Sequence, residues 1–168
     1  ARMFGSAGNG KAEIMGHWEA AAAHPDGEAM DAALMRSREF PYPYSMPGLL
    51  ACKAAEVQAG MSAHWEMFDH VQRAHAVEAT NIADPVALKA CAADIGLDVA
   101  RWEADFQSPA VRQAVEADLN EAYQLGVSAV PTLVFNRRWA LPGAVPETAL
   151  RRVVEDLLAG RDPAGDQA

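Results

Sequence analysis

The hydrophobic pattern of this chain changes period once, after Gly126, and the change limits the folds that the chain can adopt. Ahead of Gly126, apolar residues recur at the spacing of helices. Beyond it, residues 132–136 alternate as a β-strand does, residues 136–138 form a turn and residues 139–141 form a returning strand. One further helix follows and is closed by Gly160. The order of helices, hairpin and helix indicates an α/β chain that is helical over most of its length.

The first expected strand is apolar on both of its faces. Leu133 and Phe135 alternate with Thr132 and Val134. A strand of this kind belongs to the centre of a covered sheet, whereas an isolated two-stranded hairpin is only marginally stable in water. The sequence contains no other convincing strand, so we expect that sequence carrying further strands is missing from this chain, upstream of Ala1.

Pro131 stands directly before this strand. A proline cannot donate a hydrogen bond to a sheet and is therefore confined to edge strands, bulges and the first residue of a strand. The last of these fits Pro131. Bonds that precede proline are also the ones that adopt the cis form in folded proteins, where a cis bond usually has a specific reason.

Seven helices are expected ahead of the hairpin, and cap and turn residues set their bounds. Asp84–Pro85 and Ser108–Pro109 each combine an N-cap with a proline in the first turn. The stretch from Phe40 to Pro47 contains three prolines and is expected to be an extended connector, which could line a site or only cross between helices. The expected helices cover residues 11–24, 28–38, 47–60, 62–81, 84–96, 98–106 and 108–126.

Composition excludes several classes of partner. The chain of 168 residues is 51% hydrophobic and 22% charged, as expected for one soluble domain with a core. Its net charge of −9 and the absence of any basic cluster beyond Arg137–Arg138 and Arg151–Arg152 argue against nucleic acid and anionic membranes as partners. No apolar run approaches the roughly 20 residues that span a bilayer.

The two cysteines, Cys52 and Cys91, do not form a Cys-x-x-Cys motif. The simplest interpretation makes them small apolar residues of helices, and the spacing of Leu88, Cys91, Ala92 and Ile95 places Cys91 on a buried face. A disulfide between the two cysteines stays open at this stage.

Histidines and acidic residues crowd the expected helix 62–81 and suggest a metal site. Glu66 and His70 share one face, and His75 and Glu78 share another, because the two pairs lie about half a turn apart around the helix. We therefore predict no metal site. His75 is expected in the core with one ring nitrogen bonded to the backbone, and Glu66 and His70 in solvent. Packing roles are expected for four tryptophans and five methionines: Trp18, Trp65, Trp102, Trp139, Met30, Met35, Met46, Met61 and Met67.

The stretch GVSAVPTLVFNRRWALPGAVPETALRRVVEDLL, residues 126–158, resembles the C-terminal part of the DsbA family of thioredoxin-fold proteins. Four features occur in that family's order: a helix ending at Gly126, Val130–Pro131 before a strand, a hairpin, and Gly143 before a closing helix. The helical stretch from Pro47 onward resembles the family's inserted helical domain. The resemblance implies a thioredoxin-like fold divided into a loose lead-in at 1–10, a helical insertion domain at 11–126, the C-terminal part of the thioredoxin-like domain at 127–160, and a disordered tail at 161–168.

The resemblance also implies a function, thiol-disulfide oxidoreductase. The family's residue that matches Pro131 is a cis-proline beside the redox site, so Val130, Pro131 and Thr132 are the implied substrate-binding residues. The family's Cys-x-x-Cys motif, which would carry the catalysis, is absent from this sequence, and we expect that it lies in a missing N-terminal part. The implied partners are protein or peptide thiols and disulfides, with no cofactor. An unpaired strand edge favours a homodimer, and two scattered cysteines favour the cytoplasm.

Two alternatives remain open. A degenerate relative could have lost redox chemistry and kept a peptide-binding surface beside Val130. A glutathione-dependent isomerase or transferase of the 2-hydroxychromene-2-carboxylate isomerase type would use glutathione as cofactor and a serine in place of the first cysteine. Ser6 and Asn9 are the residues that raise this second alternative, although a lone serine between small residues is usually part of a flexible loop.

Overall fold

The computed structural model describes residues 10–23 and 30–163. The chain divides into two compact units at residues 116 and 117. The proposed serine and asparagine of the glutathione alternative, Ser6 and Asn9, and most of the predicted lead-in and tail lie outside the described residues. No described helix is long and apolar enough to cross a membrane.

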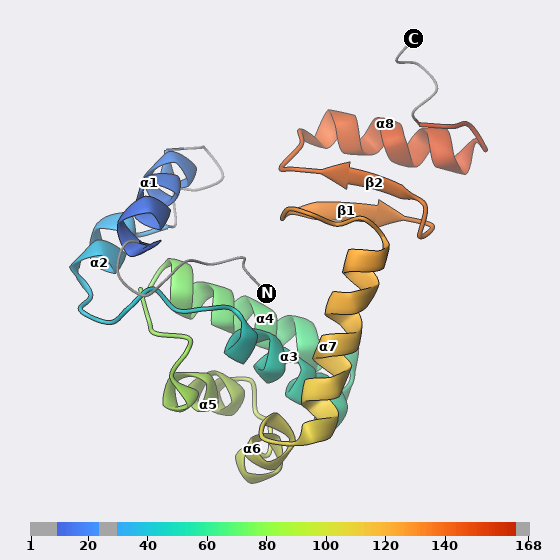
Figure 1. Ribbon diagram of the computed structural model, residues 1–168. Helices are drawn as coiled ribbons and strands as arrows, with labels where there is room; N and C mark the ends of the chain where they lie inside the picture. Colours follow the sequence, from blue (N-terminus) through green and yellow to red (C-terminus); the bar gives the residue numbers. More distant parts are fainter. Residues whose placement is uncertain (1–9, 24–29, 164–168) are drawn as a thin grey trace. The chain divides into compact units, whose positions relative to one another are not determined.

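The first unit is built around a helical hairpin (Figure 1). Helix α3 (Met46–Ala59) and helix α4 (Met61–Ala76) are joined by Gly60 alone. The backbone of Gly60 has a φ of 85°, in the left-handed region that glycine enters without steric cost. Gly48 faces Val71 inside the hairpin, where a Cβ atom would lie 3.4 Å from Val71 Cγ1, at the limit of ordinary van der Waals contact.

The main core of this unit forms between α3, α4, α5 (Pro85–Asp94) and α6 (Val99–Phe106). Trp102 of α6 is 1% exposed and donates a hydrogen bond from its indole Nε1 to the carbonyl of Ala51, at 3.1 Å. Its ring stacks on Phe106 with the centroids 5.0 Å apart. The bond satisfies the polar atom of a buried indole, which is the condition for placing tryptophan in a core.

Two smaller clusters complete the first unit. Helices α1 (Gly10–Ala22) and α2 (Ala32–Ser37) enclose Met15, Trp18 and Met35. The first turns of α7 (Pro109–Gln124) place Val111 and Val115 against Leu50 of α3.

Local sequence signals place most of these elements correctly. The side chains of Asp84 and Asp98 cap α5 and α6 by accepting bonds from Val86 N–H and Arg101 N–H. Two ends were predicted wrongly: α2 begins at Ala32, capped by Asp31, and not at residue 28, and α4 stops at Ala76 and not at Asn81. The helix ends there because Ala79 adopts a positive φ of 49° and Thr80 N–H folds back onto the carbonyl of Ala74, at 2.8 Å, as in a C-capping turn.

The second unit contains an antiparallel hairpin and a closing helix (Figure 1). Strand β1 (Thr132–Phe135) pairs with β2 (Trp139–Pro142), with Leu133 opposite Leu141. Asn136 and Arg137 both have positive φ, as a tight hairpin turn requires. Helix α8 (Glu147–Leu158) follows.

The returning strand was predicted to cover residues 139–141, and it extends one residue further, so that Pro142 is the last residue of β2. It lies opposite Thr132, next to the bonded pair in which Gly143 N–H donates to the carbonyl of Pro131 at 2.8 Å. Because bonded and non-bonded pairs alternate in an antiparallel ladder, Pro142 occupies a non-bonded position where a missing N–H has no cost.

Burial corrects three further expectations. Trp65 and Met61 were expected to pack, but each is 56% exposed on α4. Trp139 is only half-buried, and the guanidinium of Arg138 lies over its ring at 4.6 Å. His75 was expected in the core with a bond to the backbone, but it is half-buried: its Nε2 lies 2.9 Å from the hydroxyl of Tyr42, and its Nδ1 has no partner among the described residues.

Candidate functional site

The three residues implied as substrate-binding lie together at the entry to β1. Val130 is 87% exposed, and the peptide bond between it and Pro131 is cis. Thr132 is half-buried, and its hydroxyl donates to the carbonyl of Ala129 at 2.7 Å. The carbonyl of Pro131 accepts from Gly143 N–H.

These bonds leave Val130 unpaired, and the backbone of Ser128 also has no partner among the described residues. The carbonyls of Ala129 and Pro131 are occupied, whereas within the described chain the backbone N–H and C=O of Val130 have no partner. Sequence reasoning missed Gly143 as the residue that holds Pro131. The signal was present as Pro142–Gly143 directly after the returning strand, because a glycine with a φ of 86° can turn the backbone back toward the loop.

Strand β1 also has an open edge next to this loop. Among the described residues it pairs only with β2. The backbone groups of Thr132 and Val134, at non-bonded positions of this pair, point away from β2. From Val130 to Val134 the chain therefore offers a line of unpaired donors and acceptors to another extended segment.

Neither cysteine has the exposed, easily ionised thiol that disulfide exchange needs. Both are free and buried, Cys52 at 4% exposed on α3 and Cys91 at 7% on α5. Burial raises the pKa of the Cys52 thiol to about 12. Burial also raises the pKa of Cys91, and the neighbouring carboxylates of Asp94 and Glu78 raise it further. Since the thiolate is the nucleophile in disulfide exchange, neither cysteine is prepared for attack near neutral pH.

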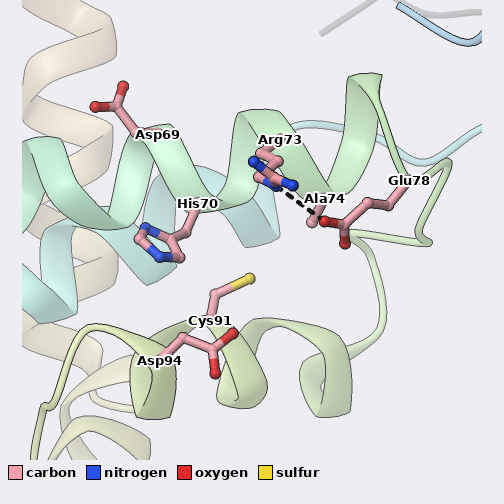
Figure 2. Close-up of a pocket in the computed structure, with 7 residues that line it drawn as sticks. All are labelled: Asp69, His70, Arg73, Ala74, Glu78, Cys91 and Asp94. Carbon is pink, nitrogen blue, oxygen red and sulfur yellow. Dashed lines mark hydrogen bonds and ion pairs between the residues drawn. The ribbon is translucent and has the colours of Figure 1, made fainter. Parts of the chain in front are cut away.

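Cys91 forms part of the wall of a cavity of about 400 Å³ between α4 and α5 (Figure 2). Within it, Arg73 Nε is paired with Glu78 Oε1 at 3.1 Å. His70 donates from Nδ1 to the carbonyl of Glu66, at 2.9 Å. The lining residues are Asp69, His70, Arg73, Ala74, Glu78, Cys91 and Asp94.

The charges of this cavity do not favour thiol chemistry. Its one arginine is already paired, and carboxylates on its rim disfavour a thiolate at Cys91. In the part of the chain that the structure describes, no three histidine, cysteine or acidic residues are grouped so that they could hold a metal ion. The loop at Val130 is therefore the stronger candidate for a functional site.

Comparison with known proteins identifies the class of the chain. The family described as Thioredoxin matches residues 12–140, most of the sequence. The chain belongs to this thioredoxin family, and its fold is thioredoxin-like, mostly helical, with a C-terminal hairpin and closing helix.

Relatives of several kinds share this region. The chain is 35% identical over 114 residues to the Na(+)/H(+) antiporter NhaA of Herminiimonas arsenicoxydans, covering 67% of this chain and 17% of that protein. It is 33% identical over 115 residues to the ClpXP adapter protein SpxH of Shouchella clausii, covering 65% and 38%. SpxH of Bacillus subtilis is 30% identical over 118 residues, covering 70% and 39%. The chain thus spans well under half the length of these relatives.

Two solved structures are similar in fold. A structure from Nitrosomonas europaea assigned as a protein disulfide isomerase has a TM-score of 0.78 and 23% identity, covering 92% of this chain and 76% of the other. The cytosolic disulfide reductase DsbM of Pseudomonas aeruginosa has a TM-score of 0.65 and 25% identity, covering 83% and 71%. DsbM has also been solved with GSH, and that structure has a TM-score of 0.64.

Proposed function

We propose that this chain is the substrate-positioning part of a DsbA-like thiol-disulfide oxidoreductase. In this proposal Val130, Pro131 and Thr132 hold an extended segment of a protein or peptide substrate. The reactive Cys-x-x-Cys pair belongs to a part of the protein outside these 168 residues. Membership of the thioredoxin family and similarity to the disulfide reductase DsbM support the proposal.

One observation carries the proposal: the exposed, unpaired backbone of Val130 continues into the open edge of β1. An extended peptide can add to such an edge as a further strand, because its own N–H and C=O groups then bond to those of the edge. Main-chain bonding of this kind accepts many sequences, which suits an enzyme that acts on many protein disulfides.

The chemistry follows from thiol-disulfide exchange. The first thiolate of the motif attacks one sulfur of the substrate disulfide, a mixed disulfide forms, and the other substrate sulfur leaves as a thiolate and takes up a proton. The second cysteine of the motif then attacks its neighbour's sulfur, loses its own proton, and releases the substrate as a dithiol. Two electrons pass from the motif to the substrate, and the reverse sequence oxidises a substrate dithiol. The chain's contribution is to hold the substrate segment while the sulfurs react.

Reduction of insulin by dithiothreitol, followed as turbidity, tests the proposal. We expect the 168-residue chain to give only the uncatalysed rate and the protein extended upstream through a Cys-x-x-Cys motif to accelerate it. In that longer protein, Val130→Pro removes the N–H that a substrate would bond, whereas Val130→Ala keeps it and serves as the matched control. We expect Val130→Pro to lose about tenfold or more in kcat/KM for a disulfide peptide, with Val130→Ala close to the parent. An inactive extended protein, or equal activity of the two variants, contradicts the proposal.

A peptide-binding module without redox chemistry is the second candidate, and the similarity to ClpXP adapter proteins favours it. The peptide-binding module and the oxidoreductase predict different results in two experiments. The natural gene would carry no Cys-x-x-Cys upstream, and peptides without cysteine would bind at Val130 as tightly as those with a disulfide. Titration of labelled peptides with serine in place of cysteine distinguishes the two functions.

The glutathione-dependent function is supported by the fold shared with DsbM, which has been solved with GSH. Adding glutathione to the isotope-labelled chain tests it, because binding would shift the amide signals of Val130 and Thr132. We further propose a cytoplasmic location, in line with the cytosolic DsbM. Without substrate, the open β1 edge is proposed to pair with a second copy of the chain, which substrate would displace; a monomer mass in light scattering would contradict this homodimer.

A further inference from the structure

Three aromatic side chains from separate segments meet in the first unit. Trp18 comes from α1, Tyr42 from the connector between α2 and α3, and His75 from the last turn of α4. Their rings pack edge to face, with centroids 5.1 Å apart for Trp18 and His75, 5.4 Å for Tyr42 and His75 and 6.1 Å for Trp18 and Tyr42. Trp18 is buried, and the other two are half-buried.

Two hydrogen bonds connect the three rings in one direction. The indole Nε1 of Trp18 lies 3.0 Å from the hydroxyl oxygen of Tyr42, and an indole can only donate. The hydroxyl of Tyr42 in turn lies 2.9 Å from Nε2 of His75. The arrangement that satisfies the hydroxyl hydrogen is therefore donation from Trp18 to Tyr42 and from Tyr42 to His75. It requires an unprotonated Nε2, and hence a neutral His75 with its proton on Nδ1.

Protonation of His75 is incompatible with this order of donors and acceptors. A charged imidazole is a donor at both nitrogens, so the Tyr42 hydroxyl loses its acceptor and faces a second donor. The ring is also poorly placed to carry a charge: burial lowers the pKa of His75, although a backbone group of Thr80 acts in the opposite direction. Among the described residues the buried Nδ1 has no hydrogen-bond partner, and since it carries a proton in both the neutral and the charged ring of this arrangement, it does not distinguish them.

The charged groups packed around the cluster do not compensate a charge on His75. On α1, Lys11 bonds to the carbonyls of Arg38 and Phe40, Glu13 and His17 are exposed, and Glu19 is paired with Arg36 of α2. At the end of α2, Arg38 bonds to the carbonyls of Ala79 and Glu78. On the segment of His75 itself, Arg73 and Glu78 are paired with each other.

We propose that Trp18, Tyr42 and His75 form a pH-sensitive clasp that holds α1 and the 40–45 connector on the end of α4 while His75 is neutral and releases them when His75 is protonated. Release uncovers the small cluster beneath, in which Met15 and Met35 are 1% and 0% exposed. A mildly acidic environment thereby exposes an apolar surface on the first unit, whereas the main core between α3 and α6 stays closed because no part of the clasp belongs to it.

Amide hydrogen exchange of the full chain at pH 7.5 and pH 5.0, corrected for intrinsic rates, tests the clasp. The quantity compared is the ratio of the opening equilibrium constant at pH 5.0 to that at pH 7.5, for the α1 amides relative to the α3 amides. We expect this ratio to be about three to ten in the parent chain. In His75→Gln, the α1 opening should be raised at both pH values and the ratio should fall to near one. Tyr42→Phe keeps the ring but loses the hydroxyl, so it should raise α1 opening at pH 7.5 and reduce the ratio.

Two histidine variants are matched controls. His70→Gln lies on the same helix and His17→Gln on α1, both outside the clasp, and both should keep the parent ratio. A parent ratio of one, or a full ratio in His75→Gln, overturns the proposal. Should His75→Gln fail to fold, nitrogen NMR of the parent decides: the clasp requires that at pH 7.5 the proton of His75 resides on Nδ1, and a proton on Nε2 overturns it.

Discussion

The two units of this chain differ in where their apolar side chains lie. In the first unit, α3 to α6 enclose a continuous core in which Met67, Leu88 and Trp102 are at most 1% exposed. In the second unit, none of the described residues from 117 to 163 is buried, and Leu158 of α8 is 84% exposed. Both units nevertheless have regular helices or strands.

The difference shows that secondary structure and burial come from separate properties of the sequence. The hairpin forms because Asn136 and Arg137 make a tight turn and β-branched and aromatic residues flank it. Its stability needs a further layer, because a two-stranded hairpin removes little apolar surface from water. The first unit buries its apolar side chains within its own helices, whereas the second leaves its apolar side chains and the Val130 loop exposed.

The largest expected effect is at Trp102. Trp102→Ala removes a buried indole, its stacking on Phe106 and its bond to Ala51, and should lower the free energy of unfolding by about 3–5 kcal/mol. Trp65→Ala, on the exposed face of α4, is the control and should change it by less than about 1 kcal/mol. Urea denaturation followed by circular dichroism measures both. Similar losses in the two variants would mean that the core between α3 and α6 is not what holds the first unit.

One substitution made in both units compares them directly. Leu88→Ala, at a side chain that is 0% exposed in α5, should cost about 2–5 kcal/mol. Leu158→Ala, at a side chain that is 84% exposed in α8, should stay within about 0.5 kcal/mol. The same urea experiment gives both values. A loss of more than about 2 kcal/mol in Leu158→Ala would show that something covers α8 in solution and would break the contrast between the units.

Alkaline pH should weaken the first unit through Cys52. The pKa of this thiol is raised from 9.0 to about 12 in the folded chain, so the unfolded chain loses the proton at lower pH. The protonated thiol therefore makes its full contribution to stability below pH 9, and this contribution is lost as the pH rises from 9 toward 12. At pH 10.5 the free energy of unfolding should have fallen by about 2 kcal/mol. Chemical denaturation at pH 8 and pH 10.5 measures it.

Cys52→Ala is the control for this pH dependence, since alanine does not titrate. It should show a smaller loss between the two pH values than the parent, whatever its stability at pH 8. Equal losses would mean that the thiol is not shielded by α3 and its neighbours. Labelling with a thiol reagent at pH 8 should agree, being slow in the native chain and fast in denaturant.

The elements whose signals are local could be predicted from sequence. Asp84–Pro85, Asp98 and Ser108–Pro109 each carry the whole information for a helix start within a few residues. The turn at Asn136–Arg138 is equally local. The loop of the candidate site was found for a different reason. The residues around Pro131 resemble those of a known family, although the function of this loop in that family depends on a Cys-x-x-Cys motif that this sequence lacks.

Contacts between distant residues could not be predicted in this way. Trp18 and Tyr42 are 24 positions apart and Tyr42 and His75 are 33, and no spacing rule joins them. The exposure of Trp65 was missed for a related reason: helical periodicity shows that residues share a face but not whether another element covers that face.

The smallest expected effect concerns charge pairs on the surface of the first unit. Lys89 of α5 and Glu103 of α6 approach to 2.6 Å, but both side chains are more than 40% exposed. Solvent screens such a pair, so its coupling energy in a double-mutant cycle of Lys89→Gln and Glu103→Gln should be about 0.2–1 kcal/mol and should shrink in 1 M salt. A coupling above about 2 kcal/mol that resists salt would mean that α5 and α6 depend on this pair and less on Leu88 and Trp102. The stability of the first unit would then come partly from its surface, and the contrast with the second unit would no longer be one of burial alone.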